Sequence, residues 1–290
     1  MTTRKFLAAA LAAISFLVMA AAHAAGSDQQ PADGFVAVSS ISISPSALLE
    51  KKHDTLLSNQ TETAVFKSNA AQAPQIRMNP AASKFVQDYI KKNSEVLQQI
   101  EARSEPVFRI MEPILSKYDV PVELKYLAVV ESDLKRTAVS RVGAAGPWQL
   151  MPVTARELGL KVSKKSDERK HLYKSTTAAA LYLRDLYTQY GDWLLVIAAY
   201  NAGPGTVNKA IRRAGSRNFW KLQAFLPAET RGHVKRFIGT HYFFEDGGSE
   251  TTLTKAENLA HTKALAQFAA QQANLPQQAD AACCEPAVTQ

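Results

Sequence analysis

Hydrophobic side chains recur at helical spacing, three or four residues apart, from about residue 80 to residue 246. The same pattern predicts one helix over 83–103 and a second over 107–117, and Pro121 then opens a third. Further helices are expected at 154–158, 176–190, 193–200, 206–213, 229–244 and 254–274. No convincing two-residue alternation of a β-strand interrupts them. We therefore predict an all-α, predominantly helical domain over residues 79–246.

The flanking segments have a different character. Residues 1–24 resemble a secretory signal, with Arg4 and Lys5, then an apolar stretch, then the small-residue cleavage pattern Ala22-His23-Ala24. We expect cleavage and export, with a retained anchor as the alternative. Residues 25–78 have the composition of a poorly ordered low-complexity linker, and 247–290 that of an Ala/Gln-rich tail.

Charge and cysteine content narrow the function classes. The formal charge is +8, and removing Arg4 and Lys5 with the signal leaves +6. An exported basic protein is attracted to anionic cell wall or to a membrane surface, although an ordinary basic surface is also common. No nucleic-acid partner is expected, because no binding motif is present. Cys283 and Cys284 are adjacent, which disfavours a disulfide between them. No metal and no cofactor are expected, because no ligand spacing is found.

Glu131 is the most informative residue. Leu124, Leu127 and Ala128 mark the inward face of a predicted helix, and Glu131 is the next position on that face. Burial disfavours an ionised carboxyl, so the side-chain pKa is expected to rise from ~4.3 to roughly 6–7, where it suits a general acid. The alternative is a core carboxylate paired with Arg or Lys.

Three other segments carry candidate chemistry. In Gly143–Pro152, the side chains of Trp148, Gln149 and Met151 offer apolar faces and an amide to a sugar, although an ordinary turn with a core tryptophan is favoured for this segment alone. Tyr200 and Asn201 in Ala198–Gly203 either line a cleft or simply end a helix. Glu229 and Arg231 open a helix, where charge pairing is the ordinary interpretation.

Taken together, these segments resemble the lytic transglycosylases related to goose-type lysozyme, and are most similar to the membrane-bound D branch. The resemblance covers about 79–246 and keeps the family's order. Its elements are Glu131-Ser132, Ala138-Val139-Ser140, the Gly143–Pro152 loop, Ala198–Gly203 and Glu229-Thr230-Arg231.

The resemblance implies a lysozyme-like fold that cleaves the glycan strands of peptidoglycan, with other cell-wall enzymes as further partners and membrane association left open. It assigns the acid/base role to Glu131. It places Ser140, Met151, Tyr200 and Glu229 around the reacting sugar, with Gln149 and Asn201 as polar groups of the cleft.

A single carboxylate can suffice if the sugar supplies its own nucleophile. Glu131 would protonate the glycosidic oxygen and then accept a proton from the C6 hydroxyl, which closes a 1,6-anhydro ring. Asp133 is expected to point elsewhere on the helix. The alternatives are a lysozyme-type hydrolase and a non-catalytic wall-binding protein. One departure from the family is His233, which stands where tyrosine is common and is expected at the surface or the cleft edge.

Overall fold

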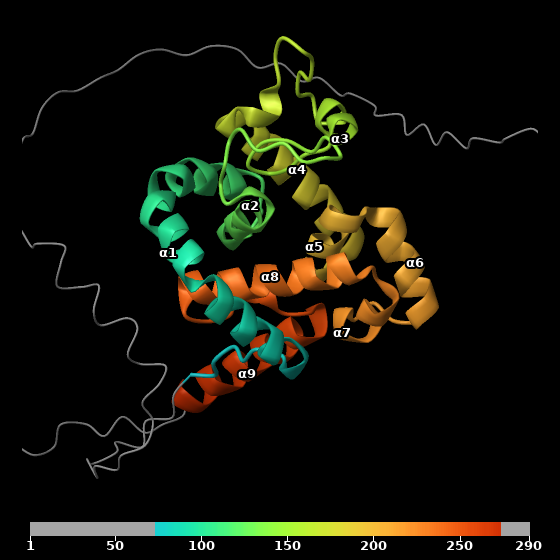
Figure 1. Ribbon diagram of the computed structural model, residues 1–290. Helices are drawn as coiled ribbons and strands as arrows, with labels where there is room; N and C mark the ends of the chain where they lie inside the picture. Colours follow the sequence, from blue (N-terminus) through green and yellow to red (C-terminus); the bar gives the residue numbers. More distant parts are fainter. Residues whose placement is uncertain (1–72, 274–290) are drawn as a thin grey trace, which may run out of the picture. The chain divides into compact units, whose positions relative to one another are not determined.

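The computed structural model describes residues 73–273, and this part of the chain is built from helices (Figure 1). The α-helices are α1 (Pro80–Lys117), α2 (Lys125–Ser132), α3 (Pro152–Glu157), α4 (Leu172–Tyr190), α5 (Trp193–Ala202), α6 (Pro204–Ala214), α7 (Phe219–Leu222), α8 (Ala228–Glu245) and α9 (Lys255–Ala273). Short 3-10 turns precede α2, α4 and α9 and follow α7. Within 73–273 the only β-pairing consists of isolated bridges. The predicted all-α class is confirmed.

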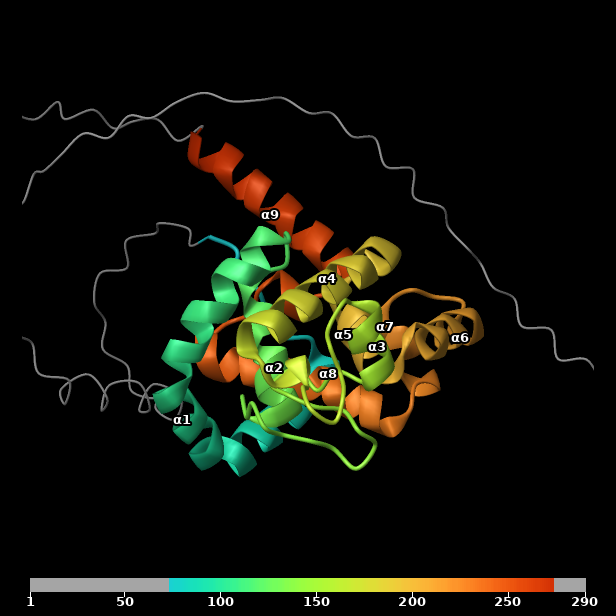
Figure 2. The same ribbon diagram turned by 90° about the horizontal axis from the view of Figure 1, so that it is seen from above.

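Helix α5 forms the centre of the core. Every residue from Trp193 to Ala199 is buried, as expected for a helix that is apolar on all sides. It packs against α4, α6 and α8, and Figures 1 and 2 both show it enclosed by these neighbours. Asp192 caps its first turn, accepting a hydrogen bond from the Leu195 amide (3.2 Å), and so fixes where the helix begins.

Helix α1 differs from the sequence prediction. The two helices expected at 83–103 and 107–117 are one continuous helix, with Pro106 and Pro113 inside it. Each proline removes a backbone donor and crowds the preceding turn, which normally bends a helix. Figure 1 shows α1 changing direction along its length. Its packing against α8 and α4 holds the two halves together despite the prolines.

The packed structure continues past the domain boundary predicted at Asp246. Thr251 to Thr254 are buried, and the Lys255 amide at the start of α9 donates to Asp192 (2.7 Å). The helix expected at 254–274 is therefore present and tied to the core. The predicted signal (1–24), most of the predicted linker, and Cys283 and Cys284 lie outside the described residues. No helix of 73–273 is both long and apolar enough to cross a membrane.

Candidate active site

Glu131 lies in the last turn of α2. Leu124, Leu127 and Ala128 are completely buried, which confirms the inward face that the sequence predicts. The Glu131 side chain is 15% exposed, so it is largely enclosed yet reachable from solvent. Asp133 ends the helix in the left-handed conformation (φ 52°) and turns the chain away. The short helix thus delivers one carboxyl group to an edge of the core.

The partner of this carboxyl is His233, on the second turn of α8. Its Nε2 lies 2.9 Å from Glu131 Oε1, and its side chain is 3% exposed. The prediction of a surface or cleft-edge histidine is wrong. Thr230, Val234 and Phe237 are also buried, so helical spacing along α8 is the sequence signal that could have placed His233 inside.

The loop after α2 is joined to that helix by Ser132, the residue that follows Glu131. Ser132 Oγ donates to the Pro147 carbonyl (2.8 Å), which joins the end of α2 to the glycine-rich loop. Gly146 has φ +81°, and a Cβ there would lie 1.9 Å from the Arg169 carbonyl oxygen. Only glycine fits this position without displacing backbone. The close approach of Gly146 to the Arg169 backbone therefore depends on the absence of a side chain.

Arg169 braces the loop from the other side. Its Nη1 donates to the carbonyls of Gly143 (2.7 Å) and Leu150 (2.9 Å), and it is almost fully buried. Two further bonds pair it with Asp167, and they hold the pKa of that carboxyl below its usual value. Nothing in the local sequence signal pointed to this long-range support, so Arg169 was missed.

The side chains of Gln149 and Ser140 form hydrogen bonds with the backbone close to them in sequence. Gln149 has φ +46°, and its Nε2 donates to the Gly146 carbonyl (2.9 Å). Its amide nitrogen is thus used internally, which leaves the amide oxygen as the atom suited to a ligand. Ser140 Oγ accepts from the Ala144 amide (3.0 Å). Gln149 lies on the predicted loop and Ser140 in the segment just before it, and their substrate roles stay predictions.

Tyr200 connects α5 to the same loop. Its hydroxyl donates to the Trp148 carbonyl (2.7 Å), so a substrate would meet it as an acceptor. Burial raises the pKa of Tyr200 well above its ordinary value, and the nearby charge of Glu131 raises it further. Trp148 is completely buried and its Nε1 donates to Thr176 (2.9 Å). Trp148 is a core residue, so its flat face is not available to a sugar.

Asn201 and Glu229 lie where α5 ends and α8 begins. Asn201 Oδ1 accepts from Thr230 Oγ1 (2.9 Å), which joins the two helices beside Glu131's partner. Glu229 is exposed in the first turn of α8, where a carboxylate favours the positive end of the helix. Arg231 donates to the Leu226 carbonyl (2.7 Å). The structure therefore gives Glu229 an ordinary helix-start setting.

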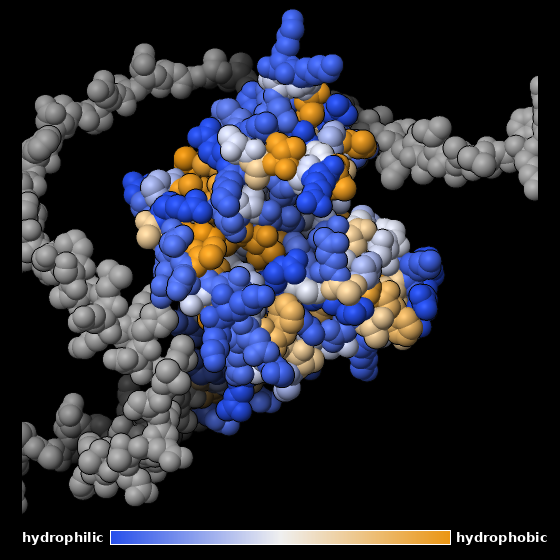
Figure 3. All heavy atoms as spheres, in the orientation of Figure 1, coloured by the Kyte–Doolittle hydropathy of each residue, from blue (hydrophilic) through white to orange (hydrophobic). Residues whose placement is uncertain are grey.

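Met151 is one of several exposed apolar side chains in this part of the chain. It is 41% exposed just before α3, and Val139, Val142 and Val153 are more exposed still. Figure 3 shows hydrophobic spheres among hydrophilic ones in this upper part of the molecule, where Figure 1 places α3. Exposed apolar side chains are common on protein surfaces, so the role of Met151 beside a sugar stays a prediction.

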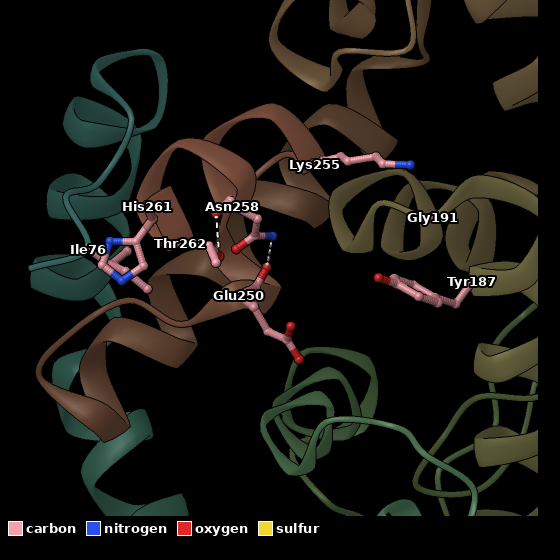
Figure 4. A pocket seen from close by; sticks show the side chains of 8 residues that line it. All are labelled: Ile76, Tyr187, Gly191, Glu250, Lys255, Asn258, His261 and Thr262. Carbon is pink, nitrogen blue, oxygen red and sulfur yellow. Dashed lines mark hydrogen bonds between the residues drawn. The ribbon is translucent and has the colours of Figure 1, made fainter. Parts of the chain in front are cut away.

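A cavity of about 400 Å³ lies elsewhere, lined mainly by α4, α9 and the turn before α9 (Figure 4). Its lining residues are Ile76, Tyr187, Gly191, Glu250, Lys255, Asn258, His261 and Thr262. Asn258 Nδ2 donates to the Glu250 carbonyl (2.9 Å), and Thr262 Oγ1 donates to the Asn258 carbonyl (3.0 Å). The cavity contains none of the motif residues, so it is not the candidate active site.

Comparison with known proteins bears on the same segment. Residues 110–223 match the family described as transglycosylase SLT domain. This segment includes Glu131 and the glycine-rich loop, whereas Glu229 and His233 lie beyond it.

One curated relative is the membrane-bound lytic murein transglycosylase D of Escherichia coli (strain K12), 39% identical over 157 residues. The match covers 52% of this chain and 34% of that protein, so the chain spans about a third of its relative's length. The resemblance predicted from the motifs is confirmed.

Two solved structures are similar over about half of this chain. The 70 kDa soluble lytic transglycosylase of Escherichia coli is 25% identical with a TM-score of 0.44, covering 51% of this chain and 26% of that one. The lytic transglycosylase Slt of Pseudomonas aeruginosa, solved as an inactive mutant, is 24% identical with a TM-score of 0.42, covering 48% and 24%.

Proposed function

We propose that the protein is a peptidoglycan lytic transglycosylase, which cleaves the β-1,4 bond between N-acetylmuramic acid and N-acetylglucosamine and leaves a 1,6-anhydromuramic end. The observation that carries this proposal is the largely enclosed Glu131 carboxyl, held by His233 and flanked by the SLT-domain loop. The relative of 39% identity is named as a lytic murein transglycosylase, which supports the same substrate class.

The local carboxylates favour a single acid/base residue. Asp133 is 42% exposed and pairs with Lys135 (2.9 Å), and Glu229 is exposed at the start of α8. Neither shares the enclosed setting of Glu131. Hydrolases of glycosidic bonds generally use two carboxylates, one of which activates water or attacks the sugar. One enclosed carboxylate fits a route in which the sugar itself provides the nucleophile.

In this route Glu131 gives its proton to the glycosidic oxygen, and the bond from that oxygen to C1 of the muramic sugar breaks. The sugar's N-acetyl carbonyl stabilises the cation. The ionised Glu131 then accepts the proton of the C6 hydroxyl as that oxygen bonds to C1. The proton count balances, and no water is consumed. Tyr200, whose hydrogen is given to Trp148, can accept from an amide N–H of the substrate.

The products test the proposal. The purified protein is incubated with insoluble peptidoglycan, and the masses of the released fragments are measured by mass spectrometry. We expect anhydro ends, which are lighter by one water than hydrolysed ends. Reducing ends would instead identify a lysozyme-type hydrolase. Binding to the wall with no released sugar would identify a non-catalytic wall-binding protein.

We further propose export to the periplasm, with peptidoglycan as the partner. The support is the signal-like N-terminal sequence and the cell-wall function of the relative named above. The intact mass of the protein recovered from an expressing bacterium checks it. Loss of residues 1–24 is expected, and an uncleaved N-terminus would mean a retained anchor.

A further inference from the structure

His233 is the part of the site that the family resemblance does not explain. It stands where tyrosine is common, and it lies beyond the residues that match the SLT domain. The structure nevertheless places its Nε2 2.9 Å from Glu131 Oε1. Glu131 is thus faced by His233 from α8 and by Tyr200 from α5, and Tyr200 Oη is already engaged with Trp148.

The two ring nitrogens of His233 have different surroundings. Nε2 meets Glu131, whereas buried Nδ1 has no hydrogen-bond partner among the described residues. Buried N–H groups without an acceptor are rare in folded proteins, and buried acceptors without a donor are somewhat less rare. The favoured form is therefore the neutral ring with its hydrogen on Nε2, because both the other tautomer and the imidazolium would place an unpaired N–H at Nδ1.

The tautomer with its hydrogen on Nε2 makes His233 a hydrogen-bond donor to the Glu131 carboxyl. A hydrogen on Nε2 is donated to Oε1, so Oε1 acts as the acceptor and the acid proton of Glu131 resides on Oε2. The same donor stabilises the carboxylate that remains once the proton has been delivered. A tyrosine hydroxyl can rotate to donate or accept, whereas this ring offers Glu131 a donor only.

We propose that His233 is a positioning residue: its Nε2–H holds Oε1 of Glu131 so that the catalytic proton is carried and delivered by Oε2. The inference rests on the proposed function, because it assumes that Glu131 is the acid/base. It adds a residue that contacts no substrate and a direction for the proton within the carboxyl.

A matched pair of variants tests the role in the full chain. His233→Gln keeps an N–H donor near the position of Nε2, and His233→Met has a similar length but no donor. We expect kcat for peptidoglycan to fall by roughly 10- to 100-fold in His233→Met, and KM to change little, because partners that orient a functional group typically have effects of this size. His233→Gln should stay within a few-fold of wild type.

The pH profile separates this role from simple loss of folding. Without the donor, the carboxyl keeps its proton to higher pH, so the basic limb of the kcat/KM profile should move to higher pH in His233→Met but not in His233→Gln. Wild-type kcat and an unmoved basic limb in a folded His233→Met would overturn the inference. An inactive wild type would instead overturn the proposed function.

A spectroscopic measurement covers the case in which His233→Met fails to fold. In ¹⁵N-labelled wild-type protein, the ring resonances of His233, assigned with His233→Gln, should show a protonated Nε2 and a bare Nδ1. They should shift in Glu131→Gln, where the hydrogen-bond acceptor changes from a carboxyl to an amide. A ring protonated on Nδ1 would contradict the proposed direction of the hydrogen bond.

Discussion

Helix α8 carries a buried histidine near each end, and the two have different surroundings. His233 is 3% exposed with one nitrogen on Glu131 and the other without a partner in the described structure. His241, two helical turns later, is 1% exposed, with Nδ1 at 3.0 Å from the Gly247 carbonyl and Nε2 at 2.9 Å from Ser249 Oγ.

The difference separates a histidine that only stabilises the fold from one that contacts the candidate acid/base residue. At His241 the ring donates to a carbonyl and accepts from a hydroxyl, so a neutral ring is fully satisfied. Burial lowers the pKa of His241 to about 4. At His233 the hydrogen-bonded nitrogen, Nε2, contacts the Glu131 carboxyl, which is largely enclosed yet reachable from solvent. One end of α8 therefore fixes a turn, and the other holds the Glu131 carboxyl in place.

The largest effect on activity is expected for a substitution of Glu131, the residue that His233 contacts. Glu131→Gln should reduce turnover of peptidoglycan by roughly 10²- to 10⁴-fold, because an amide cannot supply the proton. The thermal unfolding midpoint should stay close to wild type, because the amide oxygen can still accept from His233. Released fragments measured by mass spectrometry, alongside thermal unfolding, provide the check. Near-normal turnover in a folded variant would remove Glu131 from the acid/base role.

The sequence alone predicts only part of the arrangement around His233. The spacing of Leu124, Leu127 and Ala128 was sufficient to place Glu131 beside the core, because a helix repeats its faces locally. The partner of Glu131 lies 102 positions further along the chain, and no local pattern identifies such a pair. The same limit applies to Arg169, whose contacts with the loop depend on how distant segments fold together.

Helix boundaries show a second limit. The periodic pattern predicted α4, α5 and α8 to within a few residues, because each has a continuous buried face. It split α1 at Pro106, since proline usually ends a helix, and only packing against other helices could show that α1 continues. It also missed α7, whose four residues are too few to show a period.

The His241 end should contribute to the loss of stability of the fold in acid. The unfolded state binds a proton at this ring near pH ~6.5, whereas the folded state does so only at about 4. Unfolding therefore takes up a proton between these values, and stability falls as the pH falls through them. Between pH ~7 and ~5 the loss should be about 2 kcal/mol of the free energy of unfolding.

Urea unfolding at the two pH values measures this loss. His241→Gln is the control, because it cannot titrate there, and the carboxyl groups contribute alike to both proteins. The difference between wild type and the control isolates the histidine. An identical pH dependence in the two proteins would show that His241 binds its proton equally well folded and unfolded.

The smallest effect is expected for Ser249→Ala, also at the His241 end. Ser249 Oγ contacts His241 Nε2 and accepts from the Thr251 amide (3.2 Å) in the turn before α9. Losing this cap and the contact with the ring should cost about 1 kcal/mol of the free energy of unfolding. Turnover of peptidoglycan should be unchanged, because this end of α8 lies away from Glu131. Urea unfolding and product release, measured on the same preparation, check both statements. A loss of turnover without a loss of stability would mean that the two ends of α8 are coupled, and that the separation between the histidine that stabilises the fold and the one that contacts Glu131 does not hold.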